Sequence, residues 1–204
     1  MLNVPFVCCS YSNRYGTLIE GEYSSVSIAD GDTAQQAVEE LYRHGHRRIA
    51  ALISRPNDQS ISQLRYEGYV QALESHGIPV DPELVISTGG FGAKDAYRAV
   101  QEKMAENVDF TALFAIADSM AIGAMRALMD AGRRIPEDCS VIAIDGLELS
   151  AYIEPPLTTL CQPMEEMGRR SAEILLDMVR HKGSHACELL PTTLRQGRSV
   201  AAPG

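Results

Sequence analysis

The chain has 204 residues, enough for one large domain or two smaller lobes, and its 45% hydrophobic and 22% charged residues are ordinary for a soluble globular protein. The formal net charge is −9 and the Lys and Arg residues are scattered, so the composition argues against a nucleic-acid-binding surface. No apolar run approaches the length of a membrane span, and the opening residues lack the features of a signal peptide. We therefore expect a cytoplasmic protein whose five cysteines are reduced, buried thiols.

Short apolar runs alternate along the chain with segments that repeat apolar residues at helical spacing. The expected strands span residues 4–9, 25–29, 49–54, 84–88, 111–117 and 140–144, with weaker ones at 189–194 and 199–201. The expected helices span residues 32–45, 60–77, 96–104, 118–132 and 164–178. Strands that alternate with helices in this way predict an α/β fold with a mostly parallel sheet.

The clearest strand–helix–strand unit spans residues 111–146. Asp118 and Ser119 follow its first strand, and either side chain can cap a helix start by accepting a backbone N–H. Gly132 suits the left-handed position that ends a helix. Such a unit is right-handed and makes its two strands parallel. Ligands of open parallel sheets lie beyond the carboxyl ends of the strands, which is where Asp118 and Asp145 fall.

Four segments of the chain resemble segments of the lactose-repressor (LacI/GalR) family of bacterial transcription regulators, in that family's order and near its spacing. The segments are GHRRIA at 45–50, FAIADSMAIGAMRAL at 114–128, IPEDCSVIAID at 135–145 and PPLTTLCQPMEEMG at 155–168. The resemblance covers almost the whole chain. It implies a periplasmic-binding-protein-like (type I) two-lobed α/β fold with parallel sheets, one lobe being incomplete here.

In such a fold the chain crosses between the lobes three times. The resemblance places a partial N-terminal lobe at 1–46, the C-terminal lobe at 47–159, a helix that returns to the N-terminal lobe at 160–183, and a tail that returns to the C-terminal lobe at 184–204. The family's DNA-binding head would precede Val4. A homodimer is expected by resemblance alone.

Three residues match family positions that contact a ligand. Arg65 lies in QLRYEGY, where a guanidinium can donate to ligand oxygens, although it could instead pair with a surface acid. Phe91 can stack on a sugar or base, or else fill the core of its own lobe. Asp145 can accept hydrogen bonds from two hydroxyls, or else cap the loop that follows it.

Two further positions depart from the family. Ala117 stands where the family usually has Asn, and Ser10 stands where many members have Asp. Alanine can neither donate nor accept a hydrogen bond, so the pocket is expected to be less polar than a typical sugar site. Asp118 is expected to cap a helix first of all, and it is also a candidate ligand contact.

Other kinds of site find little support. The loop from Gly89 to Gly92 is not a dinucleotide loop, because Asp95 occupies the place of the last required glycine. The His and Cys residues lack the spacing of a zinc site, so no metal is expected. The chain has no G-x-S-x-G, H-E-x-x-H or Walker sequence, so no cofactor or enzymatic activity is expected either. The expected function is the ligand-sensing region of a transcription regulator, with a sugar-like effector, DNA contacts only through the missing head, and no membrane partner. The alternatives are a solute-binding protein of a transport system and a nucleotide-using α/β enzyme.

Overall fold

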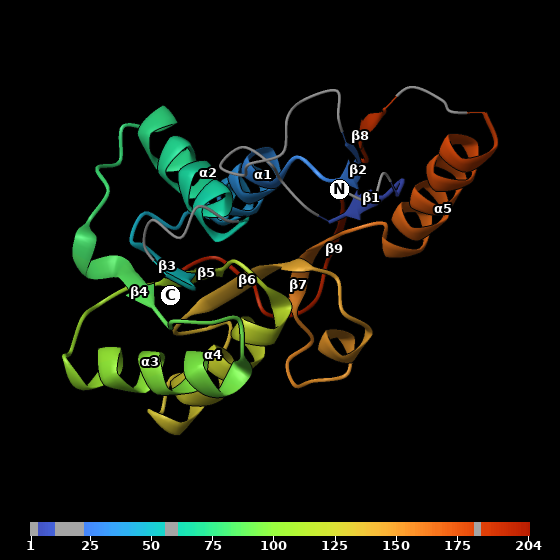
Figure 1. The fold of residues 1–204 in the computed structure, drawn as a ribbon. Coiled ribbons are helices and arrows are strands. Elements are labelled where there is room, and N and C mark those ends of the chain that lie inside the picture. The colour runs from blue at the N-terminus through green and yellow to red at the C-terminus, as the bar shows by residue number, and fades with distance from the viewer. Residues whose placement is uncertain (1–3, 11–22, 56–60, 182–184) are drawn as a thin grey trace.

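The computed structural model describes residues 4–10, 23–55, 61–181 and 185–204, and it contains two parts, each built on its own sheet (Figure 1). The larger sheet has the strand order β4-β3-β5-β6-β7-β9 and the smaller has the order β1-β2-β8. The strands are β1 Val7–Cys9, β2 Ser24–Ser27, β3 Ile49–Ile53, β4 Val85–Ser87, β5 Ala112–Ala115, β6 Ser140–Asp145, β7 Thr158–Cys161, β8 Cys187–Leu189 and β9 Thr193–Arg195. The α-helices are α1 Asp30–Arg43, α2 Ile61–Ser75, α3 Ala93–Ala105, α4 Asp118–Asp130 and α5 Met164–His181. This arrangement confirms the expected two-part α/β fold.

The larger sheet is covered by helices on both faces. Helices α1 and α2 lie on one face, and α3 and α4 lie on the other (Figure 1). Every residue of β3 and β5 is buried as a result, which explains why both strands are apolar along their whole length. All neighbouring strands are parallel except β7 and β9. The carboxyl ends of the parallel strands therefore share one edge.

Helix α1 packs against the larger sheet, and this corrects the expected division at residue 46. Its contacts are with α2 and with strands β5, β6 and β7. Gly68 of α2 allows the two helices to approach, because a Cβ on Gly68 would lie 2.1 Å from the Gly31 carbonyl oxygen and 2.9 Å from Cβ of Ala34. The first crossing therefore falls at residues 28–29, directly after β2. The crossing was wrongly expected within the GHRRIA segment, because the end of a helix and the boundary between two lobes have similar sequences.

The other two crossings also differ from the expected ones by a few residues. Strand β7 pairs with β6 in the larger sheet, so the second crossing begins at Gln162, and α5 then packs on β1 and β2. Strand β8 pairs with β2 in the smaller sheet, whereas β9 pairs with β7 in the larger one. The third crossing thus lies at residues 190–192 instead of near residues 183–186. Pro191 divides the expected strand 189–194 because proline cannot donate to a ladder.

The last residues lie along the amino ends of the larger sheet without forming the expected strand at 199–201. The backbone N–H of Val141 donates to the Ser199 carbonyl oxygen at 2.7 Å. Ser140 Oγ donates to the Ala201 carbonyl oxygen at 3.1 Å, and His46 Nε2 lies 2.9 Å from the same oxygen. These bonds fix the end of the chain to the larger sheet.

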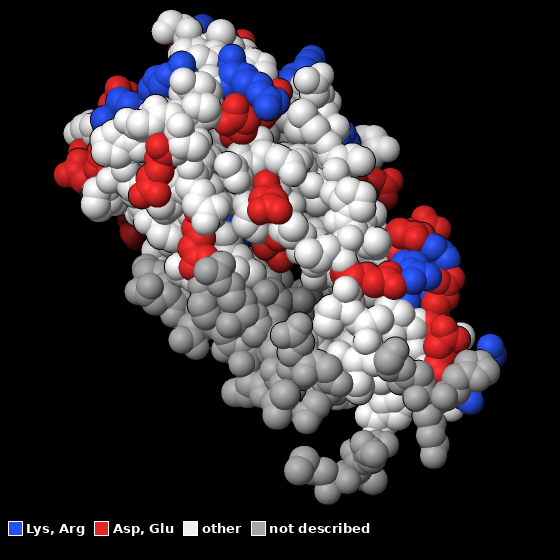
Figure 2. All heavy atoms as spheres, turned by 90° about the horizontal axis from the view of Figure 1, so that it is seen from above, with Lys and Arg blue, Asp and Glu red and all other residues white. Residues whose placement is uncertain are grey.

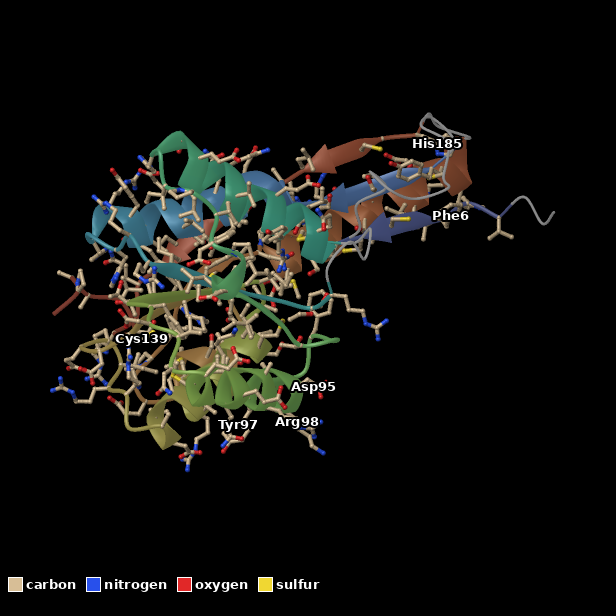
Figure 3. All side chains as sticks on the ribbon, turned by 90° about the vertical axis from the view of Figure 1, so that its left-hand side faces the viewer. Phe6, Asp95, Tyr97, Arg98, Cys139 and His185 are labelled. Carbon is tan, nitrogen blue, oxygen red and sulfur yellow. The ribbon has the colours of Figure 1, made fainter. Side chains whose placement is uncertain are left out.

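The two parts are seen side by side in Figure 3, where Phe6 and His185 belong to the smaller part and Cys139 to the larger. All five cysteines are free thiols. Cys139 is buried as expected, but Cys9 and Cys187 are exposed, because they lie on the short outer strands of the three-stranded sheet. Within the described residues, no helix is long and apolar enough to cross a membrane.

Candidate functional site

Arg65 and Asp145 meet at the carboxyl edge of the larger sheet. Arg65 lies in the first turns of α2, and Asp145 is the last residue of β6. Nη1 of Arg65 is 3.2 Å from Oδ1 of Asp145, and the Arg65 side chain is only 3% exposed. The Asp145 side chain keeps 20% of its surface exposed. The carboxylate is therefore the member of this pair that solvent or a ligand can reach.

The Arg65 guanidinium has two further partners. Its Nε donates to Oδ1 of Asp30 at 2.8 Å, and its Nη1 also donates to the carbonyl oxygen of Ile116. Asp30 is the first residue of α1, directly after the first crossing. The other terminal nitrogen, Nη2, has no acceptor within the described part of the chain. Arg65 thus holds together the ends of β5, β6 and the first crossing, with one nitrogen left to donate to a ligand.

Asp145 has a backbone conformation that side chains rarely adopt. Its φ is 139°, and Gly146 follows with a φ of 77°. A Cβ on Gly146 would lie 2.5 Å from Sγ of Cys161, so the turn is packed tightly against β7. Strained backbone at the end of a strand occurs often at binding sites, because the surrounding structure must hold it in place. Here it fixes the direction of the Asp145 carboxylate.

Asp145 also accepts two hydrogen bonds from other segments. Nε2 of Gln162 donates to its Oδ1 at 2.8 Å, and the backbone N–H of Asp118 donates to its Oδ2 at 3.3 Å. The Asp118 N–H opens helix α4, so Asp145 provides a carboxylate at that helix N-terminus, where negative charge is favoured. The alternative role expected for Asp145, capping the loop after it, is replaced by this contact with α4.

Ser10 connects the smaller sheet to this cluster. It follows β1 with a φ of 55°, and its Oγ is 3.4 Å from Oε1 of Gln162. Gln162 lies at the second crossing and also donates to Asp145. A chain of polar contacts therefore runs from Ser10 through Gln162 and Asp145 to Arg65, and it joins the carboxyl ends of both sheets.

Asp118 has a supporting role that differs from the expected helix cap. The N-cap residue of α4 is Ala117, whose side chain cannot cap the helix, and Asp118 itself lies inside the first turn. Asp118 is fully buried, and its oxygens accept from Leu147 N at 2.8 Å, Ser150 Oγ at 2.7 Å and Thr159 Oγ1 at 2.6 Å. Burial raises the pKa of the Asp118 carboxyl, against the hydrogen bonds from Thr159 and Ser150. The carboxylate thereby fixes the β6–β7 loop beneath Asp145.

Ala117 and Phe91 lie near the same edge but are not linked to the polar cluster by any described hydrogen bond. Ala117 is 4% exposed and contributes only a methyl group to the wall. Phe91 lies in the loop between β4 and α3, where its carbonyl oxygen accepts from Ser119 Oγ at 2.7 Å. Its side chain is 42% exposed, so it does not fill the core of its lobe. Stacking of Phe91 on a ligand stays a prediction.

Asp30 and Gln162 were not expected at the site from the sequence. Asp30 follows the expected strand at 25–29, so the rule that pointed to Asp118 and Asp145 at strand ends would also have found it. Gln162 lies inside the segment PPLTTLCQPMEEMG that carried the resemblance, but its side-chain contacts could not be predicted without the position of the second crossing.

Comparison with known proteins identifies the family. Residues 38–200 match the periplasmic binding protein-like domain family. The chain is 36% identical over 193 residues to the HTH-type transcriptional regulator MalR of Clostridium butyricum, which covers 95% of this chain and 57% of MalR. It is 38% identical over 177 residues to the HTH-type transcriptional repressor CytR of Escherichia coli K12, which covers 84% of this chain and 51% of CytR.

A solved structure gives the same result at the level of the fold. The transcriptional regulator CelR in complex with cellobiose superposes with a TM-score of 0.83 and 33% sequence identity, covering 91% of this chain and 56% of that chain. These relatives are regulators by name, and this chain spans about half the length of the curated relatives it matches. The chain therefore belongs to the periplasmic binding protein-like domain family, in the form found as the effector-binding region of LacI/GalR regulators.

Proposed function

We propose that this chain senses a small polar effector, most simply a sugar, on behalf of a bacterial transcription regulator in the cytoplasm. The observation that carries the proposal is the contact between Arg65 and Asp145, which lies where the carboxyl ends of both sheets meet. Polar side chains that converge from several strand ends are typical of ligand sites in open α/β sheets. The cellobiose found in the CelR complex supports a carbohydrate as the class of effector.

Each side chain of the site has a separate part in this proposal. Asp145, partly exposed and fixed by its backbone, accepts a hydrogen bond from one sugar hydroxyl, in addition to those from Arg65, Gln162 and the Asp118 N–H. Nη2 of Arg65 donates to a second oxygen. Phe91 covers an apolar face of the sugar ring, and its 42% exposure leaves it free to do so. Ala117 and Ser10 leave part of the wall uncharged, which favours a ligand with few hydroxyls on that side or one that resembles a nucleobase.

The effector acts through the relative position of the two sheets. Ser10 of the smaller part contacts Gln162, which contacts Asp145 of the larger part, so a ligand bound at Asp145 changes the contacts that join the parts. A ligand can shift a two-state equilibrium only by the difference in its affinity for the two states. In the proposed regulator this difference biases a DNA-binding head elsewhere in a longer protein, which acts as a homodimer.

The proposal is tested first by a thermal-shift screen of the intact protein with monosaccharides, disaccharides and nucleosides, followed by calorimetry on each hit. A specific ligand with a stoichiometry of one per chain is expected, because bound ligand stabilises the folded state. Adding that ligand should then change the affinity of the full regulator for its operator. If no sugar or nucleoside binds at millimolar concentration, or if the bound ligand leaves operator affinity unchanged, the proposed function is wrong.

A further inference from the structure

The charges of the cluster do not balance. Three carboxylates, those of Asp30, Asp118 and Asp145, are joined by direct or shared contacts at the carboxyl edge of the larger sheet. Two guanidinium groups face them. Arg65 contacts Asp30 and Asp145, and Nη2 of Arg195 lies 3.9 Å from Oδ2 of Asp118. The described residues of the cluster therefore carry one more negative than positive charge.

Asp30 determines how much of Arg65 a ligand can use. Both side chains are 3% exposed, and the 2.8 Å bond joins Nε of Arg65 to Oδ1 of Asp30. Arginine binds a phosphate or carboxylate most strongly when two of its parallel N–H groups donate to two oxygens of the anion. One such pair includes Nε, which Asp30 already occupies, while Nη1 is shared by Asp145 and the Ile116 carbonyl oxygen. Among the described contacts of Arg65 a single nitrogen, Nη2, is left for the ligand, which suits a hydroxyl better than an anion.

The carboxylates also repel one another. Burial is the main cause that raises the pKa of Asp30, Arg65 opposes it, and the negative charge of Asp145 adds to it. Asp145 raises the pKa of Asp118 in the same way, as a smaller contribution than burial. A ligand anion placed beside Asp145 would meet the same repulsion in a partly desolvated site.

We propose that Asp30 is a specificity-determining residue, which engages Arg65 from the side of the first crossing so that the site takes uncharged sugars and rejects their phosphorylated or carboxylate forms. This inference rests on the proposed function, because it concerns the ligand of the same site. The inference adds that the site selects its ligand by charge. Arg65 alone would favour anionic ligands, since a buried arginine without a carboxylate partner attracts anions.

The test uses sets of ligands that share a skeleton but differ in charge, with the intact protein. One set is glucose, glucose 6-phosphate, gluconate and glucosamine, and a second is ribose, ribose 5-phosphate and ribonate. Dissociation constants are measured by calorimetry for the parent, for Asp30→Asn and for Asp32→Asn. Asparagine at position 30 keeps an oxygen that can accept from Nε of Arg65. Asp32 is the matched control, because it lies on the same helix and is exposed.

The parent should bind the uncharged sugar of a set about tenfold or more tightly than the phosphorylated or acid form of that sugar. Its affinity for the amino form should not be lower than for the uncharged sugar. In Asp30→Asn this preference should fall by about tenfold or reverse, whereas Asp32→Asn should keep the parent's ratio. A parent that binds the anionic form more tightly overturns the inference while leaving effector sensing intact, as does an unchanged ratio in folded Asp30→Asn.

If Asp30→Asn does not fold, the ratio in the parent decides alone, since the inference requires selection against anions there. If no member of these sets and no other sugar or nucleoside binds, the proposed function fails, and the inference fails with it.

Discussion

Arg65 and Asp145 are 80 positions apart in the chain, yet Nη1 of Arg65 lies 3.2 Å from Oδ1 of Asp145. The parallel topology brings them together, because α2 follows the carboxyl end of β3 and Asp145 is at the carboxyl end of β6, and these two strand ends lie at the same edge of the larger sheet. The Arg65 side chain is almost fully buried in this contact, whereas the Asp145 side chain is partly exposed to solvent. This asymmetry lets the pair stabilise the fold and still offer an acceptor to a ligand.

Arg65→Ala should lower the free energy of unfolding by about 3–5 kcal/mol, because it leaves Asp30 buried without its charge partner. Urea denaturation followed by circular dichroism measures the loss. Arg126→Ala is the matched control, since Arg126 forms an ion pair with Asp130 but is 69% exposed. The control should change stability by about 0.5 kcal/mol or less. Equal losses in the two variants would show that the Arg65 contacts contribute little to the fold.

His46 should make the protein less stable as the pH falls. It is 1% exposed, with Nδ1 3.0 Å from Thr111 Oγ1 and Nε2 2.9 Å from the Ala201 carbonyl oxygen. Burial lowers its pKa, against the hydrogen bond to Ala201. The unfolded chain therefore takes up a proton at about pH 6.5 while the native state does not, so stability falls as the pH drops through this value.

The pH dependence of His46 is measured by urea denaturation at pH 7.5, 6.5 and 5.5. His46→Gln should be less stable than the parent at pH 7.5, but the difference should shrink towards pH 5.5, by up to about 1.4 kcal/mol per pH unit. His185→Gln, which replaces an exposed histidine of the smaller part, is the control. A constant difference between His46→Gln and the parent at all three values would contradict the assignment.

Gly68→Ala should destabilise the protein by about 1–3 kcal/mol, the usual cost of overpacking. The added methyl would lie 2.1 Å from the Gly31 carbonyl oxygen, so α1 and α2 would have to separate. Gly168→Ala is the matched control, because Gly168 is also helical but has open space around its Cβ position. The control should be neutral or slightly stabilising. A tolerated Gly68→Ala would argue against α1 packing on α2 and for the original division at residue 46.

This 204-residue chain by itself should not bind DNA with sequence selectivity. Its net charge is −9, and the face seen in Figure 2 has its Lys and Arg side chains interspersed with Asp and Glu. Phosphate contacts are strongest at low salt, so a gel-shift experiment at low salt is the most demanding test. A tight shift that depends on the DNA sequence would refute the prediction, and scrambled DNA of the same length provides the comparison.

Much of the fold could be predicted because its signals are local. The buried strands β3, β5 and β6 are continuous apolar runs, and the helices between them show apolar residues at helical spacing. The crossings could not be placed as well. Whether α1 covers the larger or the smaller sheet depends on the fit of Gly68 against Gly31, which is a contact between distant segments.

The candidate site was predictable to the extent that strand ends define it. Arg65 and Asp145 were each expected to contact a ligand, and they lie in contact with each other. Asp118 follows a strand too, but three donors from the β6–β7 region surround it, and no sequence pattern shows such a network. The engagement of Arg65 by Asp30 was missed for the same reason, because it depends on how the first crossing meets α2.

The central claim, that Asp145 is the acceptor for a polar effector between the two sheets, is tested most directly by calorimetry on Asp145→Asn with the ligand found by screening. Asparagine tolerates an unusual backbone but lacks the charge, so affinity should fall by about ten- to a hundredfold, the loss for one charged hydrogen bond. Asp109→Asn, an exposed residue before β5 at the opposite edge of the sheet, should bind like the parent. If folded Asp145→Asn binds the effector as tightly as the parent and the Asp109 control, the effector does not bind at Asp145 and the account is wrong.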